Sequence, residues 1–353
     1  MSPRINYVIV HFVTNKKKLF ASFILLFLFY IILIQTKFMS NFNFMNCYSF
    51  ESECYVNIED VLPNIDNNVL PPAKSIYFHE TSSVGFLNSR QVCSIESAAK
   101  THPDWQINVI FIGPLSTKQF EKISFRVLRS YENIKFYKVN ILKYAKGTPL
   151  EEMVKDGHLN KSRWQIYHMS DALRYLTLYK WGGVYLDLDV VVAKSFESLK
   201  ENWAARESDT YVAAGAMAFS RDPLGRRIAG DSHCFIFREF KNNFRGDIWA
   251  HNGPGVITRI LENFCKTRVI TEMSASSCKG FEVYGPDLFY PVHWKNASLY
   301  FETTELDVGQ PYTYHLWNYL THNYKVDVQS AYAKLAKEYC PITYETYNYQ
   351  FGL

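Results

Sequence analysis

The sequence lacks the features that mark several large classes of protein. Its 38 Lys and Arg residues are nearly balanced by 34 Asp and Glu, so the net charge is only +4 and no clustered basic face is present. This balance argues against a nucleic-acid-binding protein. The seven cysteines show no C-x-x-C spacing, which argues against a zinc knuckle. After residue 73 the chain has no repeat and no long low-complexity stretch, which indicates one large domain.

Long apolar runs are also scarce, and the one that is present lies near the N-terminus. Residues 19–34 carry no charge, Lys16, Lys17 and Lys18 precede them, and Lys37 follows. The run is slightly shorter than the ~20 residues that span an average bilayer, yet the membranes of the secretory pathway are thin enough for it. The charge asymmetry places the N-terminus in the cytoplasm. A cleaved signal peptide is the alternative, but the run exceeds a typical signal core and no small-x-small cleavage site follows it.

We therefore predict four parts of the chain. They are a cytoplasmic tail over residues 1–18, a transmembrane signal anchor over 19–36, a stem over 37–73 and a luminal domain over 74–353. An oxidising lumen favours disulfide bonds, but the odd count leaves at least one thiol over, and the spacing does not reveal the pairing. The cysteines are Cys47, Cys54, Cys93, Cys234, Cys265, Cys278 and Cys340. Two N-x-S sequons, at Asn160 and Asn296, are glycosylation acceptors wherever they are luminal and exposed.

The first half of the luminal domain alternates between buried strands and helices. Apolar runs predict strands over residues 75–78, 107–112 and 134–139, and helical patterns over 91–99 and 118–129 separate them. Buried strands joined by helices indicate an α/β domain with a mainly parallel sheet. Ligands of such sheets bind at the carboxyl ends of the strands.

The most informative stretch, SDALRYLTLYKWGGVYLDLDVVV, begins at Ser170. Ser170 is a favourable N-cap, apolar residues recur after it at helical spacing, and Gly182 and Gly183 end the helix. We predict a strand directly after the glycines, with Asp187 and Asp189 at its carboxyl end. Two carboxylates in an apolar run are costly to bury unless a cation compensates them. Hard oxygen ligands of this type suit Mg²⁺ or Mn²⁺ that bridges to a phosphate.

Two features of this stretch have competing interpretations. Asp171 and Arg174 lie one turn apart on the predicted helix, so they form either a surface ion pair worth a few tenths of a kcal/mol or a pair that grips ligand hydroxyls. The D-x-D-x-V pattern also resembles the first motif of aspartate-nucleophile phosphatases, which need a later acidic pair. Gly230-Asp231 and Gly246-Asp247 each begin such a pair, but Phe235 and His251 stand where the second aspartate would be. This departure argues against a phosphatase.

Several motifs occur together along the chain. The first set is Asp171-x-x-Arg174, Gly182-Gly183 and Tyr185-x-Asp187-x-Asp189. The second set is CSIESAAKTHP from Cys93, WAHNGPGVITR from Trp249, FYPVHW from Phe289, YHLWN from Tyr314 and YCP from Tyr339. The first set resembles the D-x-D sugar-binding region of retaining glycosyltransferases, and both sets together resemble the animal α-1,4-glycosyltransferases over residues 75–345. Leu188 departs from that family, in which threonine is usual, but this middle residue is not the ligand.

The resemblance implies a glycosyltransferase-A fold, a nucleotide-sugar donor and Mn²⁺ or Mg²⁺ as cofactor. Asp187 would contact the ribose and donor sugar and share the metal with Asp189. Tyr185 would contact the nucleotide or brace the aspartates, and Asp171 and Arg174 would bind sugar hydroxyls. The other implied site residues are Glu80, Thr81 and Ser82 in a turn at the uridine, His315 as a late metal ligand, and Asn252 and Gly253 in a turn near the donor sugar or acceptor. Three tryptophans either stack on sugars or pack in the core: Trp249, Trp294 and Trp317.

The resemblance also implies an activity. We expect a retaining α-1,4-hexosyltransferase that moves galactose or N-acetylgalactosamine from its UDP-sugar to a terminal β-linked galactose or N-acetylgalactosamine of a glycosphingolipid. We expect it in the Golgi membrane as a single-pass type II protein, with the aromatic-rich second half, after about residue 209, on the acceptor side. Two alternatives stay open: a transferase that acts on glycoprotein O-glycans, and a catalytically inactive luminal carbohydrate-binding protein of the same fold. The sequence does not choose the donor sugar, because one or two pocket side chains can decide it.

Overall fold

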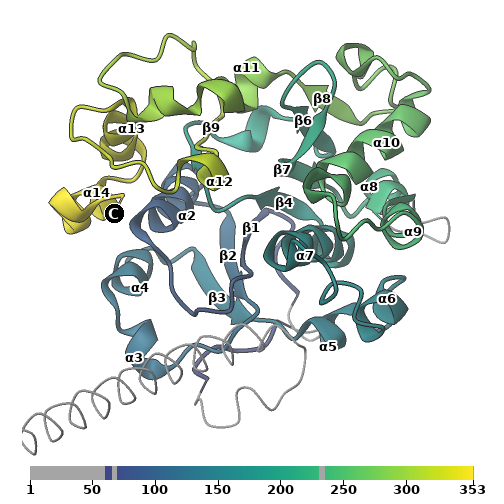
Figure 1. The fold of residues 1–353 in the computed structure, drawn as a ribbon, viewed down its shortest axis with the longest axis horizontal. Coiled ribbons are helices and arrows are strands. Elements are labelled where there is room, and N and C mark those ends of the chain that lie inside the picture. The colour runs from purple at the N-terminus through teal and green to yellow at the C-terminus, as the bar shows by residue number, and fades with distance from the viewer. Residues whose placement is uncertain (1–59, 66–69, 230–234, 353) are drawn as a thin grey trace, which may run out of the picture. The chain divides into compact units, whose positions relative to one another are not determined.

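A seven-stranded sheet forms the centre of the computed structural model, which describes residues 60–65, 70–229 and 235–352 (Figure 1). The strand order is β3-β2-β1-β4-β7-β6-β8. The strands are β1 (Ser75–Glu80), β2 (Gln106–Phe111), β3 (Ile134–Lys138), β4 (Gly183–Leu186), β6 (Trp203–Arg206), β7 (Val212–Phe219) and β8 (Glu282–Tyr284). The first four strands are mutually parallel, β6 is parallel to β8, and β7 is antiparallel to both of its neighbours. The prediction of a mainly parallel α/β sheet is therefore confirmed.

Helices cover both faces of this sheet (Figure 1). The most relevant to the site are α2 (Ser89–Thr101), α7 (Gln165–Trp181), α8 (Pro223–Ala229) and α10 (Pro254–Cys265). Helix α2 packs on β2, whereas α7 packs on β1, β4 and β7, and β7 also contacts α8 and α10. Side chains alternate between the two faces along β1. Ile76 and Phe78 share a core with Val92 of α2, while His79 hydrogen-bonds Thr177 of α7.

Two helices differ from their predictions. The pattern over residues 118–129 forms two short helices, α3 (Thr117–Phe120) and α4 (Ile123–Leu128), because the backbone is extended at Lys122. The helix expected to begin at Ser170 begins at Gln165 instead, so the N-cap assignment of Ser170 is wrong. His168 and Met169 are buried, and their packing holds an additional turn ahead of Ser170.

Shorter elements make up the rest of the described chain. β5 (Val190–Val192) and β9 (Thr313–His315) form a two-stranded antiparallel sheet. Helices α13 (Ala331–Tyr339) and α14 (Pro341–Tyr347) pack against α2. The remaining α-helices are α5 (Ile141–Ala145), α6 (Glu151–Lys155), α9 (Phe235–Asn242), α11 (Pro286–Phe289) and α12 (Asn318–Thr321). The 3-10 helices are Phe196–Ser198, Trp249–His251, Ile270–Glu272, Trp294–Phe301 and Asn348–Gln350.

Two disulfide bonds link the described cysteines, Cys93 to Cys340 and Cys265 to Cys278. The other cysteines, the predicted tail and the predicted anchor lie outside the described residues. Within the described ranges, no helix has the length and apolar character that crossing a membrane requires.

Residues 60–65 fall in the predicted stem but pack on the domain. Leu62 and Ile65 are buried, and Asn64 bridges to Lys138 of β3. Part of the segment predicted as a stem therefore contributes to the packed core.

Candidate active site

The chain turns sharply from α7 into β4 at two glycines. Gly182 (φ 62°) and Gly183 (φ 92°) have positive φ values, at which a side chain would be strained. A Cβ atom on Gly183 would also lie 2.6 Å from the carbonyl oxygen of Ser75 in β1. The predicted helix stop is confirmed. The close approach lets β4 pair with β1 and brings Asp187 to the carboxyl edge of the sheet.

Asp187 is held by groups from three elements. Its backbone N–H donates to the Gly215 carbonyl of β7 at 2.8 Å. The Tyr185 hydroxyl donates to Oδ1 at 2.7 Å, which is a bracing arrangement, and Arg174 Nη1 lies 3.1 Å from the same oxygen. Burial alone would raise the pKa of Asp187, but Arg174, His315 and the Tyr185 hydroxyl lower it to about 2. Asp187 is therefore an ionised carboxylate with a fixed orientation.

Asp189 is tied to a segment far along the chain. The backbone N–H of Asn318 donates to Asp189 Oδ2 at 2.7 Å, and the N–H of Leu316 donates to the Asp189 carbonyl at 2.9 Å. The D-x-D motif and the YHLWN motif are therefore in direct contact.

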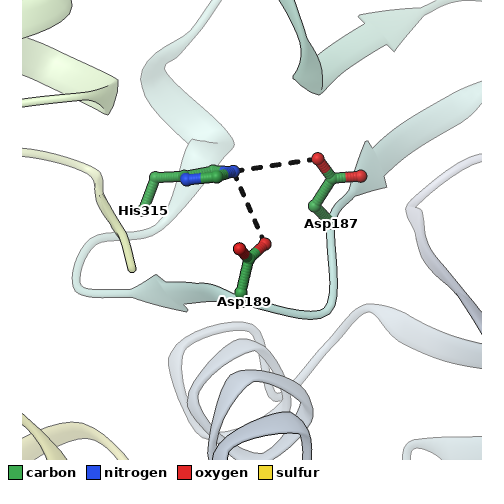
Figure 2. Close-up of side chains that lie close together, drawn as sticks. All are labelled: Asp187, Asp189 and His315. Atoms are coloured by element: carbon green, nitrogen blue, oxygen red, sulfur yellow. Dashed lines mark ion pairs between the residues drawn. The ribbon is translucent and has the colours of Figure 1, made fainter. Parts of the chain in front are cut away.

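His315 supplies a third ligand atom to the same place. It pairs with Val190 across the small sheet, and its Nε2 lies 3.5 Å from Asp189 Oδ1 and 3.7 Å from Asp187 Oδ2 (Figure 2). Burial alone would lower the pKa of His315, but the two facing carboxylates raise it. One ligand atom from each of the three side chains lies within 4.8 Å of the others. The three side chains together form a potential metal site.

A buried ion pair lies behind the aspartates. Arg174 Nη2 lies 3.2 Å from Asp171 Oδ1, and only 8% and 7% of the two side chains are exposed. The surface-pair interpretation is therefore wrong. Arg174 also donates to the Ala214 carbonyl at 2.8 Å. Burial raises the pKa of Asp171 to about 7, although Arg174 opposes the shift.

The sequence analysis did not identify two residues that support this network. The Ser170 hydroxyl accepts from Arg174 Nη2 at 2.9 Å and lies 3.1 Å from the Tyr185 hydroxyl. Gly215 lies within β7, where a Cβ atom would come within 2.7 Å of Asp187 Oδ2. A glycine inside a strand marks a close approach, so the sequence AAGAM contained a signal for it.

The turn after β1 lies at the same edge of the sheet, because β1 and β4 are parallel neighbours. The Ser82 backbone N–H donates to Glu80 Oε1 at 2.7 Å, while Glu80 Oε2 is buried and has no hydrogen-bond partner in the described part of the chain. Burial raises the pKa of Glu80, against the opposing effect of these Ser82 hydrogen bonds. The Thr81 hydroxyl donates to the Ile166 carbonyl at 3.1 Å. Uridine contact by these three residues stays a prediction.

The turn at Asn252 and Gly253 lies behind Asp171. A Cβ atom on Gly253 would overlap the Asp171 carboxylate, and the Tyr175 hydroxyl donates to the Gly253 carbonyl at 2.7 Å. The Asn252 side chain is fully buried, donates to the Arg245 carbonyl and accepts from the Arg245 N–H. The Asn252 side chain is therefore hydrogen-bonded to backbone groups of the protein. Gly253 is the residue of this turn that lies against Asp171 of the site.

The remaining predicted residues differ in exposure. Asn296 is exposed and Asn160 is half-buried. The Trp317 indole N–H donates to a backbone carbonyl at 2.8 Å, which is a packing role. Trp249 and Trp294 are each 41% exposed, so neither is a core residue.

Two parts of the chain match described protein families. Residues 88–208 match "Glycosyltransferase sugar-binding region containing DXD motif", and residues 233–347 match "Alpha 1,4-glycosyltransferase conserved region". The first match contains both aspartates, and the second contains His315.

Curated relatives that align over about three quarters of the chain carry related names. The mouse (Mus musculus) lactosylceramide 4-alpha-galactosyltransferase is 31% identical over 287 residues, which cover 76% of this chain and 75% of the relative. The human (Homo sapiens) alpha-1,4-N-acetylglucosaminyltransferase is 26% identical over 288 residues, covering 78% and 81%. Among solved structures, galactosyltransferase LgtC in complex with donor and acceptor sugar analogs aligns with a TM-score of 0.39 at 16% identity, over 75% of this chain and 95% of that chain.

Proposed function

Because this chain belongs to the α-1,4-glycosyltransferase family, we propose that it is a retaining, UDP-sugar-dependent transferase with a glycosyltransferase-A fold. The donor sugar is galactose or N-acetylgalactosamine, and the acceptor is the terminal β-linked galactose or N-acetylgalactosamine of a glycosphingolipid. The names of the galactosyltransferase relatives support the glycolipid acceptor. The proposal places the domain in the Golgi lumen, behind the predicted type II anchor.

The convergence of Asp187, Asp189 and His315 at one edge of the sheet carries this proposal. Ligands bound to one Mn²⁺ or Mg²⁺ lie about 2.1 Å from the ion and so at most about 4.2 Å from each other. The Nε2-to-oxygen distances of 3.5 and 3.7 Å fall within that limit. All three ligand atoms lie within 4.8 Å of one another, so Asp187, Asp189 and His315 would hold one cation after at most a small side-chain adjustment. Such an ion, when bound, neutralises charge on the departing diphosphate.

The protein groups around this centre bind and orient the donor. Asp187 stays ionised because Arg174 and Tyr185 stabilise its charge. Asp171, with a pKa near neutrality, can both donate and accept hydrogen bonds to sugar hydroxyls. Two carboxylates and the Ala214 carbonyl hold the Arg174 side chain in place. Its positive charge therefore faces the donor without any movement of the side chain on binding.

Transfer with retention then proceeds on one face of the donor sugar. The bond between the anomeric carbon and the diphosphate oxygen breaks, and the acceptor hydroxyl oxygen bonds to the same face of that carbon. The hydroxyl proton passes to the departing diphosphate oxygen, which balances the step without a protein nucleophile. Trapping of a covalent glycosyl-enzyme would contradict this mechanism.

The test uses the full-length chain in detergent, Mn²⁺, UDP-galactose or UDP-N-acetylgalactosamine, and acceptors of both the glycolipid and the O-glycan type. Transfer from one donor, with an α-1,4 linkage by NMR and loss of activity on chelation, is the expected result. It would settle both the donor and the acceptor class. Folded protein that neither transfers sugar nor releases UDP from any donor would favour the inactive carbohydrate-binding alternative.

A further inference from the structure

Exposed apolar side chains gather at particular places in the described chain. Three pairs of large, exposed hydrophobic residues are adjacent in sequence: Ile166 and Tyr167, Ile248 and Trp249, and Tyr319 and Leu320. They lie at the start of α7, at the beginning of the 3-10 helix Trp249–His251, and in α12. Single exposed hydrophobic residues are ordinary, whereas contiguous ones mark binding surfaces.

The aromatic rings of these segments form one cluster, which we call the aromatic platform: Trp164, Tyr167, Trp249 and Tyr319. Trp249 and Tyr319 stack, with ring centroids 5.7 Å apart and planes inclined by 22°. Tyr167 meets these two rings edge-on at 6.1 and 5.6 Å, and Trp164 meets Tyr167 and Tyr319 edge-on at 6.3 and 6.4 Å. Tyr167, Trp249 and Tyr319 remain 36%, 41% and 47% exposed. The rings thus hold one another in place while part of each stays accessible.

The aromatic platform borders the candidate active site on two sides. Asn318, which directly precedes Tyr319, donates its backbone N–H to Asp189 Oδ2 at 2.7 Å. Thr81, in the predicted uridine turn, donates its hydroxyl to the carbonyl of Ile166, which directly precedes Tyr167. The segments that carry two of the four rings are therefore hydrogen-bonded to the predicted metal and nucleotide groups.

We infer that the aromatic platform is the acceptor subsite, which binds the pyranose ring of the acceptor glycan; the inference rests on the proposed function. An aromatic face carries partial negative charge and attracts the C–H face of a sugar. The four rings bear no formal charge, so the platform suits a neutral sugar. The anionic donor is instead matched by Arg174 and by the cation that the carboxylates and the imidazole would hold. Its position beside Asp189 would set the acceptor hydroxyl next to the donor sugar.

The test compares matched aromatic truncations in the full-length chain. Trp249→Ala and Tyr319→Ala each remove one platform ring, while Trp249→Phe keeps an aromatic face. Tyr349→Ala is the control, because Tyr349 is 77% exposed and lies outside the cluster. Four quantities are measured: KM for lactose as a soluble acceptor, KM for the donor, kcat, and UDP release to water without acceptor.

The expected result is a rise of roughly tenfold in KM for lactose in each platform alanine variant, with donor KM and UDP release to water unchanged. Trp249→Phe should recover most of the loss, and Tyr349→Ala should have no effect. An unchanged lactose KM would overturn the inference. So would a defect limited to lipid-linked acceptors in vesicles, which would assign the platform to the membrane surface, or an equal loss of UDP release, which would assign it to the donor.

A binding measurement separates this inference from the proposed function. Lactose is titrated against the full-length chain and the variants by saturation-transfer NMR, which needs no turnover. Lactose binding that depends on Trp249 and Tyr319 in a chain without transferase activity would contradict the proposed function and retain the platform. Transferase activity together with lactose binding that does not depend on Trp249 or Tyr319 would support the proposed function and overturn the platform.

Discussion

Two regions of this domain each combine a buried arginine with carboxylate side chains, and the carboxylates have different partners in the two regions. The first region, which we call the helix anchor, joins α2 to the C-terminal segments through Arg90 and Glu96. The second is the candidate active site, built around Arg174 with Asp187 and Asp189. Arg90, Glu96 and Arg174 are buried, whereas the side chains of Asp187 and Asp189 are 28% and 18% exposed. Both regions link segments far apart in sequence.

In the helix anchor each charge meets neutral groups. Arg90 donates to the carbonyls of Thr321, Tyr324 and Gly352. Glu96 Oε1 accepts from the Tyr131 hydroxyl and the Ile342 N–H, and Oε2 accepts from the N–H and hydroxyl of Thr343. Both oxygens are therefore fully engaged by the protein.

In the candidate active site the charges meet each other. Arg174 contacts Asp171 and Asp187. Within the described part of the chain, Asp187 Oδ2 and Asp189 Oδ1 share one neighbour, the His315 ring, whose Nε2 lies 3.7 and 3.5 Å from them. These distances are too long for strong hydrogen bonds. The comparison teaches that a buried carboxylate with both oxygens engaged by neutral donors is structural. Convergent carboxylates joined only by a distant imidazole instead keep oxygens that can bind a cation, as proposed for Asp187 and Asp189.

The same chemical change in the two regions should separate these roles, and the largest effect is expected at Asp189. Asp189→Asn removes the charge but keeps an oxygen that can accept the Asn318 N–H. We expect transferase activity to fall by about a thousandfold or more, since a cation that stabilises a leaving group supplies several kcal/mol. The midpoint of thermal unfolding should stay within a few degrees of the original. Retained turnover in the metal-dependent assay would remove Asp189 from the metal site.

The second change, Glu96→Gln, should lower the stability of the fold and leave the transferase activity unchanged. The new amide NH₂ group must face N–H or O–H donors that a carboxylate oxygen accepted. We expect a loss of about 2–4 kcal/mol in the free energy of unfolding, which lowers the midpoint of thermal unfolding by roughly 5–15 °C. kcat measured well below that midpoint should be unchanged. A selective loss of kcat with intact stability would show that the helix anchor acts on the site.

The smallest effect concerns His102, at the end of α2, and appears in the pH dependence of stability. Its Nε2 accepts the Phe196 N–H at 2.9 Å and its Nδ1 donates to the Ala98 carbonyl at 3.2 Å, so the folded state holds a neutral ring. Burial lowers the pKa of His102 to about 4. Between about pH 6.5 and 4 the unfolded chain binds a proton that the folded chain does not, so stability falls as the pH falls, by up to about 1.4 kcal/mol per unit.

Chemical unfolding of the original chain and of His102→Gln at several pH values measures this slope. The variant should show a shallower decline between pH 6.5 and 4, because it removes one titrating group. Equal slopes in both proteins would mean that His102 is accessible to protons in the folded state.

The sequence was sufficient where local signals agree with the fold. Strands β1, β2 and β3 follow from apolar runs, and Gly182 and Gly183 predict the turn that delivers the aspartates. It was insufficient where packing decides. Ser170 has the right side chain for an N-cap, yet the burial of His168 and Met169 places it inside the helix. Tertiary context overrides local preference in such cases.

Contacts between residues far apart in the sequence were the part of the site that was hardest to predict from the sequence. His315 reaches the aspartates because β9 pairs with β5, a contact that no local pattern encodes. The resemblance supplied that residue, and residue spacing alone would not. Gly215 gave a local signal, but its meaning depends on β7 being the neighbour of β4. The burial of Asp171 and Arg174 likewise requires knowledge of what covers α7.

The helix anchor also constrains how the chain can be synthesised. Cys93 is joined to a partner 247 residues later, and the Ser89 hydroxyl accepts the Gly352 N–H across 263 residues. Arg90 and Glu96 depend on the same late segments. Helix α2 is therefore made long before its partners exist, and a growing chain leaves these groups unsatisfied until residue 352 has emerged. The domain therefore cannot complete its packing until residue 352 has emerged, and α2 stays exposed to chaperones in the interval.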